Sequence, residues 1–405
     1  MAQTKERKGS GGRERQTPGK EFKPDWHYQE PVDWRDTDID EKVLKEWYYW
    51  MLLGRQIDYR CQVLNRQGRA PFIISCAGHE AAQIGVAWPL KPKYDWISPY
   101  YRDVVLCFRM GLTALDLMLS VLAKPADPAS GGKQTPGHFS DTRLNIISGG
   151  SPLSTQMVHG AGAAYALRMD GTDKVLMTCY GEGAGSEGDT HEAFNFAAIY
   201  KLPEIFVCQN NGFAISVPFS KEYAIQHAAQ RAAGYGFPGV TVDGRDPVTC
   251  YHVSKQAVAR ARAGDGPTLI ETLVDRLGAH SSEDDQRRYR TQEELDALTQ
   301  NDCLVRFQSQ LLAEKIIDKA LAGFGSARCR VLDCMRAGLH LLPAGCQHVS
   351  RCGSVTTTSR PLLTANLSAS SAVGHQWPHA RLSSRNASRG VMAMPRMRFT
   401  TTAAM

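Results

Sequence analysis

The stretch from Lys174 to Ser216, KVLMTCYGEGAGSEGDTHEAFNFAAIYKLPEIFVCQNNGFAIS, contains two short apolar runs with one amphipathic segment between them. Short apolar runs that end in glycines or amides predict buried strands, and the segment at 189–199 predicts a helix. The same alternation continues along the chain, with strands expected over GVTVDG and PTLIETLVDR and helices expected near 224–233 and over 247–263. This order predicts an α/β fold with a mainly parallel sheet and helices on both of its faces.

Three parts of the chain differ in composition. Residues 1–35 are polar and charged and contain glycine and proline, which is typical of a flexible arm. Residues 36–326 carry the strand and helix pattern, which opens with a broad apolar stripe typical of a helix from about Asp40. Residues 327–405 contain ten arginines and a single acid, Asp333, and show no sustained period. We expect this atypical tail, rich in Arg, Ser and Thr, to be poorly ordered.

Composition and charge argue against several classes of protein. The net charge of +6 comes from the tail, since ten arginines against one acid give it +9 and leave the remainder at −3. A mildly acidic body argues against nucleic acid as the main partner. No long apolar run occurs, so neither a membrane span nor a secretory signal is expected. The 11 cysteines form no CxxC pair, which favours a reducing compartment: the cytoplasm or, in a eukaryote, the mitochondrial matrix.

A glycine-rich motif follows the first of the two strands. The segment from Gly183 to Gly188, GAGSEG, fits the GxGxxG pattern of dinucleotide-binding folds. A dinucleotide site also requires an acid at the end of the second strand, where it would bind the ribose hydroxyls. Gln209, Asn210 and Asn211 stand there instead, so we do not favour a nicotinamide or flavin site.

A metal-bridged diphosphate accounts for more of these residues. Mg²⁺ prefers oxygen ligands and shares them between one or two protein groups and substrate phosphates. Glu182 at the end of the first strand supplies a carboxylate, and Asn211 after the second strand supplies a neutral amide oxygen. Glycines allow the backbone to approach phosphates, and the helix expected from Asp189 offers its N-terminus to them. The two strand ends therefore predict a site for magnesium and a diphosphate.

At this point the residues carry a family resemblance. The Gly-Glu-Gly of 181–183 with Asn210 and Asn211 resembles the thiamine-diphosphate signature. The chain from about Asp40 to Phe324 resembles the alpha subunit of the E1 component of 2-oxo acid dehydrogenase complexes, and the branched-chain members most of all. The motifs SPYYRD, GGSPLSTQ and RLGAHSSEDD follow the order of that family. The resemblance implies a thiamine-diphosphate-binding fold, with thiamine diphosphate and Mg²⁺ as cofactors.

The resemblance also implies site residues. Glu182, Asn211 and the carbonyl of Phe213 match the family's Mg²⁺ ligands. The implied cofactor contacts lie in several loops: Tyr101, Arg102, Ser151, Leu153, Gly181, Gly183, Ala184, Gln209 and His280. A K⁺ site is expected at Ser151, Pro152, Thr155 and Gln156, with Gly150 in place of the first serine of the family motif.

Two histidines are candidates for catalysis. His280 matches the active-site histidine of a loop that covers the cofactor, and His138 is a second candidate, for which a structural role is the alternative. Gln209 stands where animal members carry an arginine, so one charge partner of the diphosphate is missing and Arg102 is expected to carry more of that role. His79, in AGHEAAQIG, is interpreted as a helix-start residue.

The activity that the resemblance implies is oxidative decarboxylation of 2-oxo acids such as 3-methyl-2-oxobutanoate. The acyl group passes to the lipoyl group of an E2 acyltransferase. In this family a beta subunit supplies a carboxylate to the site, so we expect an α₂β₂ heterotetramer and no activity from this chain alone. The alternatives are a pyruvate or acetoin dehydrogenase alpha subunit, or a non-catalytic subunit damaged in its tail, because the sequence after about Gly325 resembles no part of the family.

Overall fold

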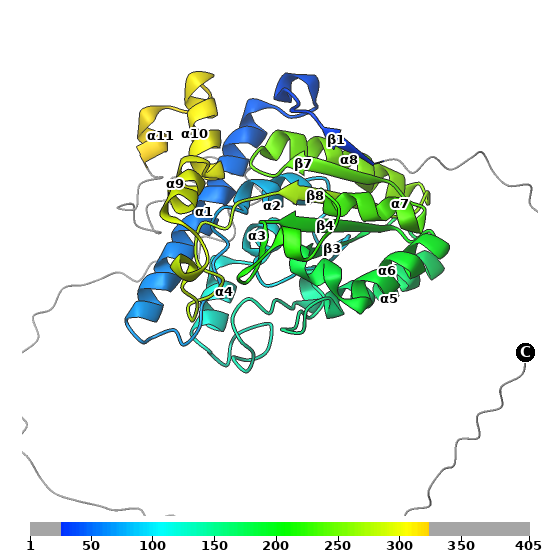
Figure 1. The fold of residues 1–405 in the computed structure, drawn as a ribbon, viewed down its shortest axis with the longest axis horizontal. Helices are drawn as coiled ribbons and strands as arrows, with labels where there is room; N and C mark the ends of the chain where they lie inside the picture. Colours follow the sequence, from blue (N-terminus) through cyan, green and yellow to red (C-terminus); the bar gives the residue numbers. More distant parts are fainter. Residues whose placement is uncertain (1–25, 324–405) are drawn as a thin grey trace, which may run out of the picture. The chain divides into compact units, whose positions relative to one another are not determined.

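A computed structural model describes residues 26–323 of the chain, and its central element is a parallel sheet (Figure 1). The sheet has six strands in the order β1-β7-β8-β4-β3-β2, and every neighbouring pair runs parallel. The strands are β1 (Trp26–Gln29), β2 (Trp96–Ser98), β3 (Leu176–Gly181), β4 (Glu204–Asn210), β7 (Gly239–Asp243) and β8 (Thr268–Leu273). A separate antiparallel pair, β5 (Phe213–Ala214) and β6 (Val217–Pro218), follows β4.

Helices cover both faces of the sheet, as the sequence predicts. One face packs against α5 (Thr155–Met169), α6 (Gly188–Ile199) and α7 (Ala232–Tyr235). The other face packs in one apolar cluster with α1 (Glu41–Arg66), α2 (Glu80–Ala87), α3 (Val104–Met110), α4 (Ala114–Val121) and α8 (Pro247–Arg262). Figure 1 shows α5 and α6 on one side of the sheet and α8 on the other. Among the helices within residues 26–323, none is long and apolar enough to cross a membrane.

The alternation of side chains along β3 explains why a continuous apolar run is needed there. Successive residues of a strand point to opposite faces of the sheet. Leu176 and Tyr180 lie in the cluster with α5 and α6, whereas Met177 and Cys179 lie in the cluster with α2 and α8. Because helices cover both faces, both sets are buried, which is typical of parallel sheets.

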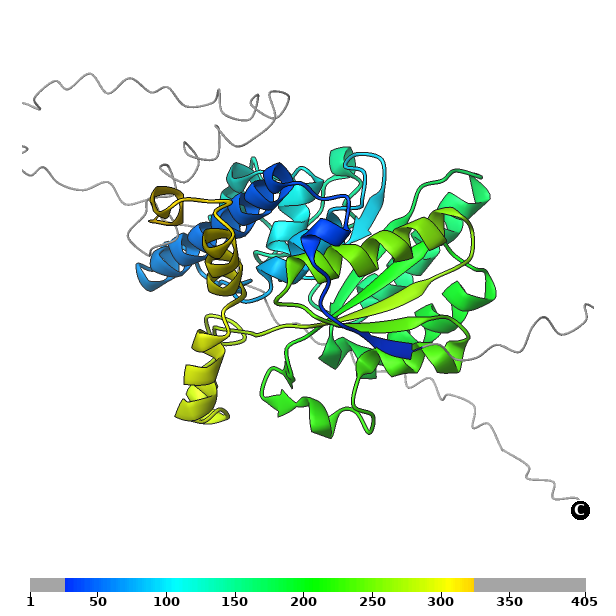
Figure 2. The same cartoon turned by 90° about the horizontal axis from the view of Figure 1, so that it is seen from above.

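Three further helices follow β8. They are α9 (Gln292–Gln300), α10 (Cys303–Ala313) and α11 (Lys319–Gly323). Arg55 of α1 donates to both Glu80 of α2 and Asp302, the N-cap of α10, at distances from 2.6 to 3.1 Å. This partly buried ion pair network fixes α10 beside α1, and Figure 2 shows the two helices next to each other.

Two sequence predictions need correction. The arm predicted over 1–35 extends too far, because Trp26–Gln29 forms β1 and pairs with Gly239–Val242 of β7 at the sheet edge (Figure 2). The helix predicted near 224–233 begins late, as a 3₁₀ turn at Ala228–Arg231 that leads into α7. The amides of Ala228 and Ala229 donate to the buried carboxylate of Glu271, so a tertiary contact sets this start. Residues 1–25 and the tail predicted over 327–405 lie outside the described residues.

A buried acid lies at the amino end of β4, away from the strand ends that carry the predicted site. Glu204 has no exposed surface, and its Oε1 accepts a hydrogen bond from Thr178 Oγ1 at 2.7 Å. Its Oε2 has no partner within the described residues. Burial raises the pKa of Glu204 from 4.5 to about 8.

We expect Glu204 to make the folded chain less stable as pH rises. The folded state keeps a proton that the unfolded state releases, so stability is lost between pH 4.5 and about 8. Glu204→Gln retains the shape without the charge and should remove this part of the pH dependence, on the order of 5 kcal/mol in unfolding free energy. Urea unfolding of both proteins below and above this window measures the difference. An unchanged pH dependence in the variant would contradict the assignment.

Candidate functional site

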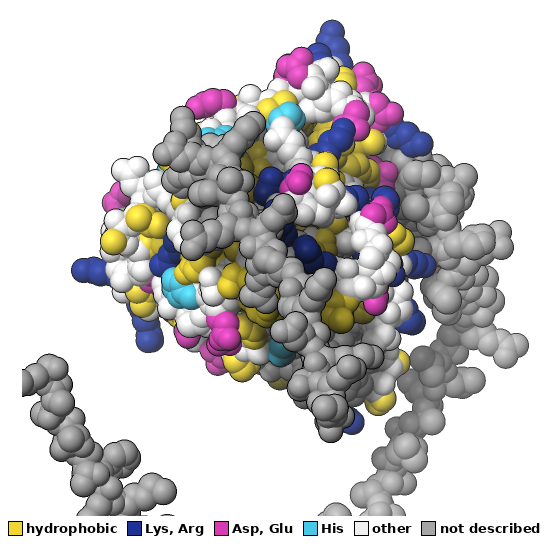
Figure 3. Space-filling view, turned by 90° about the vertical axis from the view of Figure 1, so that its right-hand side faces the viewer, with side chains coloured by type: hydrophobic (Ala, Val, Ile, Leu, Met, Phe, Trp, Pro, Cys, Tyr) yellow, Lys and Arg dark blue, Asp and Glu magenta, His cyan; other side chains and the backbone are white. Residues whose placement is uncertain are grey.

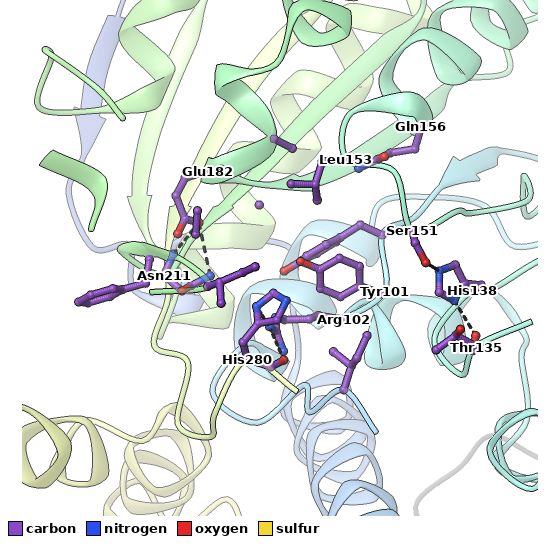
Figure 4. Close-up of a pocket in the computed structure, with 18 of the residues that line it drawn as sticks. Tyr101, Arg102, Thr135, His138, Ser151, Leu153, Gln156, Glu182, Asn211 and His280 are labelled. Atoms are coloured by element: carbon purple, nitrogen blue, oxygen red, sulfur yellow. Dashed lines mark hydrogen bonds between the residues drawn. The ribbon is translucent and has the colours of Figure 1, made fainter. Parts of the chain in front are cut away.

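A cavity of about 500 Å³ lies at the carboxyl ends of β3 and β4 (Figure 4). Ligands bind at this edge in open parallel sheets. Most residues predicted for the site line the cavity: Tyr101, Arg102, His138, Ser151, Leu153, Gln156, Gly181, Glu182, Gly183, Ala184, Asn211, Phe213 and His280. Gln209, Pro152 and Thr155 do not line it. The fold therefore brings together segments that are far apart in the sequence.

The two strand ends place a carboxylate beside an amide. Glu182 Oε2 accepts hydrogen bonds from the backbone N–H of Asn211 at 3.2 Å and from its Nδ2 at 3.4 Å (Figure 4). The second carboxylate oxygen of Glu182, Oε1, and the amide oxygen of Asn211, Oδ1, are both buried without a partner within the described residues. Burial raises the pKa of Glu182 to about 7. Unpaired buried oxygens are costly, and two of them side by side fit a hard cation.

This donor set fits Mg²⁺ that is shared with a bound anion. Within residues 26–323, no group of three His, Cys, Asp or Glu side chains could hold a metal ion. A cation at Glu182 and Asn211 would therefore need oxygens from backbone or from a ligand, which is how Mg²⁺ is usually held. Phe213 lines the same cavity, and its carbonyl accepts a hydrogen bond from Arg276 Nη1 at 3.3 Å.

Two of the glycines of GEGAGSEG, Gly183 and Gly185, allow the turn after β3 to pack closely. A Cβ atom on Gly183 would lie 2.6 Å from the Cβ of Ala214, and one on Gly185 would lie 1.9 Å from Tyr223 Oη. The Tyr223 hydroxyl also donates to the carbonyl of Glu182 at 2.7 Å. The spacing of these glycines is thus explained by contacts with 214–223, which fix the carbonyl of the metal-site glutamate.

Arg102 and His280 form a hydrogen-bonded pair in the cavity. Arg102 donates through Nη2 to His280 Nδ1 at 3.1 Å and to the His280 carbonyl at 2.9 Å, and through Nη1 to the carbonyl of Ser75 at 2.7 Å. A guanidinium only donates, so Nδ1 is an acceptor and the neutral His280 carries its proton on Nε2. Burial and the positive charge of Arg102 lower the pKa of His280 to about 4. The imidazole is therefore neutral near pH 7.

The loop that carries His280 is tied to the loop after β4. Asp284 accepts from the His280 backbone N–H at 2.8 Å and from Tyr289 Oη at 2.5 Å. Tyr289 Oη in turn accepts a hydrogen bond from Arg276 Nη2. The same nitrogen donates a second hydrogen bond to the carbonyl of Ile215, which lies in the loop after β4. Sequence reasoning missed Arg276 and Tyr289. A basic residue three positions after the end of β8 was the only signal available for Arg276.

His138 lies on the opposite wall of the cavity (Figure 4). Its Nδ1 is 2.6 Å from the carbonyl of Thr135, and its Nε2 is 2.6 Å from Ser151 Oγ. Because a carbonyl only accepts, the neutral ring carries its proton on Nδ1 and Nε2 accepts from the Ser151 hydroxyl. This arrangement brings two predicted residues together and fixes the tautomer of His138.

Residues 48–321 match the family model described as dehydrogenase E1 component. The chain belongs to this family. The match covers the six-stranded sheet apart from β1, together with all segments that line the cavity. The family assignment that the sequence motifs predict is therefore confirmed.

Several dehydrogenase E1 relatives are similar to this chain. The 2-oxoisovalerate dehydrogenase subunit alpha of Bacillus subtilis is 50% identical over 273 residues, which are 67% of this chain and 83% of the relative. The 3-methyl-2-oxobutanoate dehydrogenase subunit alpha of Mycobacterium tuberculosis is 37% identical over 305 residues, 72% of this chain and 77% of the relative. A pyruvate dehydrogenase E1 component subunit alpha of Staphylococcus aureus is 40% identical over 279 residues, 68% of this chain and 71% of the relative.

Three predicted site residues of this E1 chain lie away from the cavity lining. Gln209 has no exposed surface and bonds Asp103 and His79 inside the protein, which differs from the direct cofactor contact that we expected. Pro152 is exposed, and Thr155 is the first residue of α5. His79 is the N-cap residue of α2, so its interpretation as a helix-start residue is confirmed.

Proposed function

We propose that this chain is the alpha subunit of a branched-chain 2-oxo acid dehydrogenase E1. It would catalyse the thiamine-diphosphate-dependent oxidative decarboxylation of 2-oxo acids such as 3-methyl-2-oxobutanoate. The observation that carries the proposal is the pair of unpaired oxygens on Glu182 and Asn211 at the carboxyl edge of the sheet of an E1 family member. The names of the Bacillus subtilis and Mycobacterium tuberculosis relatives support the branched-chain substrate class.

The cofactors in this proposal are thiamine diphosphate and Mg²⁺. Bound thiamine diphosphate would supply an electron sink for the bond that breaks when CO₂ leaves. Glu182, Asn211 and the carbonyl of Phe213 would hold Mg²⁺, and Tyr101 and Arg102 would contact the diphosphate. Further contacts would come from Gly181, Gly183, Ala184, Ser151 and Leu153. We retain the K⁺ site at Ser151, Pro152, Thr155 and Gln156 as part of the proposal.

The two cavity histidines would have different roles. Neutral His280 offers an N–H at Nε2, which can donate to an oxygen that becomes negative during the reaction. His138 holds its Nε2 as an acceptor for the Ser151 hydroxyl, so it orients that hydroxyl and can take its proton. Both histidines line the same cavity, so both could act on one substrate.

A partner subunit would complete the site. Among the residues that line the described cavity, Glu182 is the only acid, and Asn211 already occupies one of its oxygens. A second carboxylate would therefore come from a beta subunit in an α₂β₂ heterotetramer. Two apolar side chains near the cavity are open to solvent, Leu153 at 41% and Ile215 at 52% exposed. Figure 3 shows hydrophobic side chains mixed with charged ones on one outer face. After the reaction, a lipoyl-bearing E2 would receive the acyl group.

Turnover with and without a beta subunit tests the proposal. With a branched-chain beta subunit we expect kcat/KM for 3-methyl-2-oxobutanoate to exceed that for pyruvate by about 10-fold or more, since each extra methylene in an apolar pocket contributes about that much. Without a beta subunit we expect no turnover. Activity of the chain alone would contradict the shared site. A preference for pyruvate would favour the second candidate, a pyruvate dehydrogenase alpha subunit, which the Staphylococcus aureus relative suggests.

A further inference from the structure

A buried group of polar side chains surrounds Gln209 behind the cavity. Gln209 Nε2 donates to Asp103 Oδ1 at 2.5 Å, and its Oε1 lies 2.9 Å from His79 Nδ1 and 3.2 Å from Gln83 Nε2. The exposed fraction of all four side chains is 0%. Gln209 stands two positions before Asn211, at the end of β4. It thus links the strand that carries Asn211 to residues from α2 and from the turn before α3.

The hydrogen bonds within this group fix the orientation of each amide, and His79 Nε2 is the one ring nitrogen of the group without a partner among the described residues. A carboxylate accepts, so the amide nitrogen of Gln209 must face Asp103 and its oxygen must face the other two side chains. Gln83 is fixed in the same way, because its Nε2 donates to a carbonyl and its Oε1 accepts from the Val105 backbone N–H. His79 then carries its proton on Nδ1 and donates it to Gln209. An apolar residue at 209 would leave donors and acceptors unpaired inside the protein.

The partners of Gln209 hold the turn that carries Tyr101 and Arg102. Asp103 Oδ2 accepts from the backbone N–H of Tyr100 at 2.9 Å, and Gln83 Nε2 donates to the carbonyl of Arg102 at 2.8 Å. The backbone of the turn is therefore fixed at both ends by side chains that Gln209 joins. Tyr101 and Arg102 line the cavity, whereas Gln209 does not.

We propose that Gln209 is a positioning residue, which holds the Tyr101–Arg102 turn in the conformation that binds a diphosphate without contacting the ligand itself. This inference rests on the proposed function, in which the cavity binds thiamine diphosphate. Without Gln209 the turn would populate other conformations, and the apparent affinity would fall with the fraction of protein that keeps the competent turn. Saturating ligand would restore that turn, so a loss of affinity would exceed any loss of turnover.

Calorimetric titration of the full-length chain, in complex with a beta subunit, with thiamine diphosphate in the presence of Mg²⁺ tests this role. We expect Gln209→Leu to raise Kd about 10- to 100-fold, as for other residues that orient direct ligands. Arg102→Ala should also raise Kd. The double variant should bind no more than about twofold worse than Arg102→Ala, because Gln209 acts through the turn that presents this arginine. Gln83→Met removes the hydrogen bonds of Gln83 to Gln209 and to the carbonyl of Arg102. It should therefore raise Kd to the same extent as Gln209→Leu.

Two controls separate positioning from loss of stability. Val207→Ala, on the same strand and fully buried, should lower the unfolding temperature and leave Kd within about twofold. In the complex with a beta subunit, Gln209→Leu should raise the half-saturating cofactor concentration and lower kcat at saturation by less than about threefold.

The outcomes distinguish failure of the inference from failure of the proposed function. A wild-type complex with a beta subunit that binds no thiamine diphosphate would overturn the proposed function and the inference with it. Wild-type binding that Gln209→Leu and Gln83→Met leave unchanged would overturn the inference alone. If the two increases in Kd multiply in the double variant, Gln209 acts independently of Arg102. That result would also overturn the inference.

Discussion

Glu182→Gln is expected to raise the Kd for thiamine diphosphate in the presence of Mg²⁺ by about 100-fold, since a charge-assisted contact contributes about 1.5–3 kcal/mol. The substitution preserves the shape of the side chain and the acceptor for Asn211, but it removes the single carboxylate of the cavity lining. Asn211→Ala should act in the same direction, because it removes the second unpaired oxygen. Titrations with and without Mg²⁺ measure both effects.

Glu187→Gln is the matched control for this prediction. Glu187 lies five positions further along the same glycine-rich segment, is exposed, and makes no side-chain cap bond to α6. It should bind the cofactor like the wild type. Binding that is independent of Mg²⁺ and unaffected by Asn211→Ala would exclude a metal clamp at the two strand ends.

His280→Ala is expected to lower kcat of the complex with a beta subunit by about 100-fold or more, the usual range for a group that donates or accepts a proton. The pKa of about 4 means that the ring is neutral across the physiological range, so its role is to offer the Nε2 proton rather than a positive charge. We therefore expect kcat to show no titration that depends on His280 between pH 6 and 8. Steady-state rates over that range measure both quantities.

His159→Ala provides the comparison for His280, because His159 is exposed on α5 and does not line the cavity. Its rate should match the wild type. The Kd for thiamine diphosphate in His280→Ala should change by less than about tenfold, since Arg102 and the metal-site oxygens remain. A variant that binds cofactor poorly and turns over normally at saturation would assign His280 to binding instead of to the reaction.

The sequence predicted the elements with strong local signals. The strands β3, β4, β7 and β8 are apolar runs bounded by turn residues, and the position of a parallel sheet's ligand edge follows from their direction. The sequence therefore predicts that Glu182 and Asn211 lie close together, and the hydrogen bonds between them confirm this. The helical stripe of α1 and the boundaries of α6 and α8 also agree within one or two residues.

What the sequence did not reveal depends on contacts between distant segments. Strand β1 has only four residues, too few to show the alternation of apolar and polar side chains that indicates a strand. The residues of β7 with which it pairs lie more than 200 positions away in the sequence. Alternation along β4 indicates the face of the sheet to which the Gln209 side chain points. Ile205 and Val207 share that face and lie in the cluster with α2 and α8, so Gln209 points to the same side. The link from Arg276 through Tyr289 to the His280 loop has no local pattern at all.

The pairing of β1 has a consequence for how the chain folds as it leaves the ribosome. Trp26 emerges early, yet its register partner in the sheet is Gly239, and β7 is itself held in place by β8, which ends at Leu273. The amino-terminal segment must therefore wait for most of the domain to be synthesised before it can add to the sheet edge. Contacts of such long sequence separation form slowly. A nascent or truncated chain that stops before β8 leaves β7, even with β1 paired to it, separated from β4 and the rest of the sheet. The open strand edges then favour association with other chains.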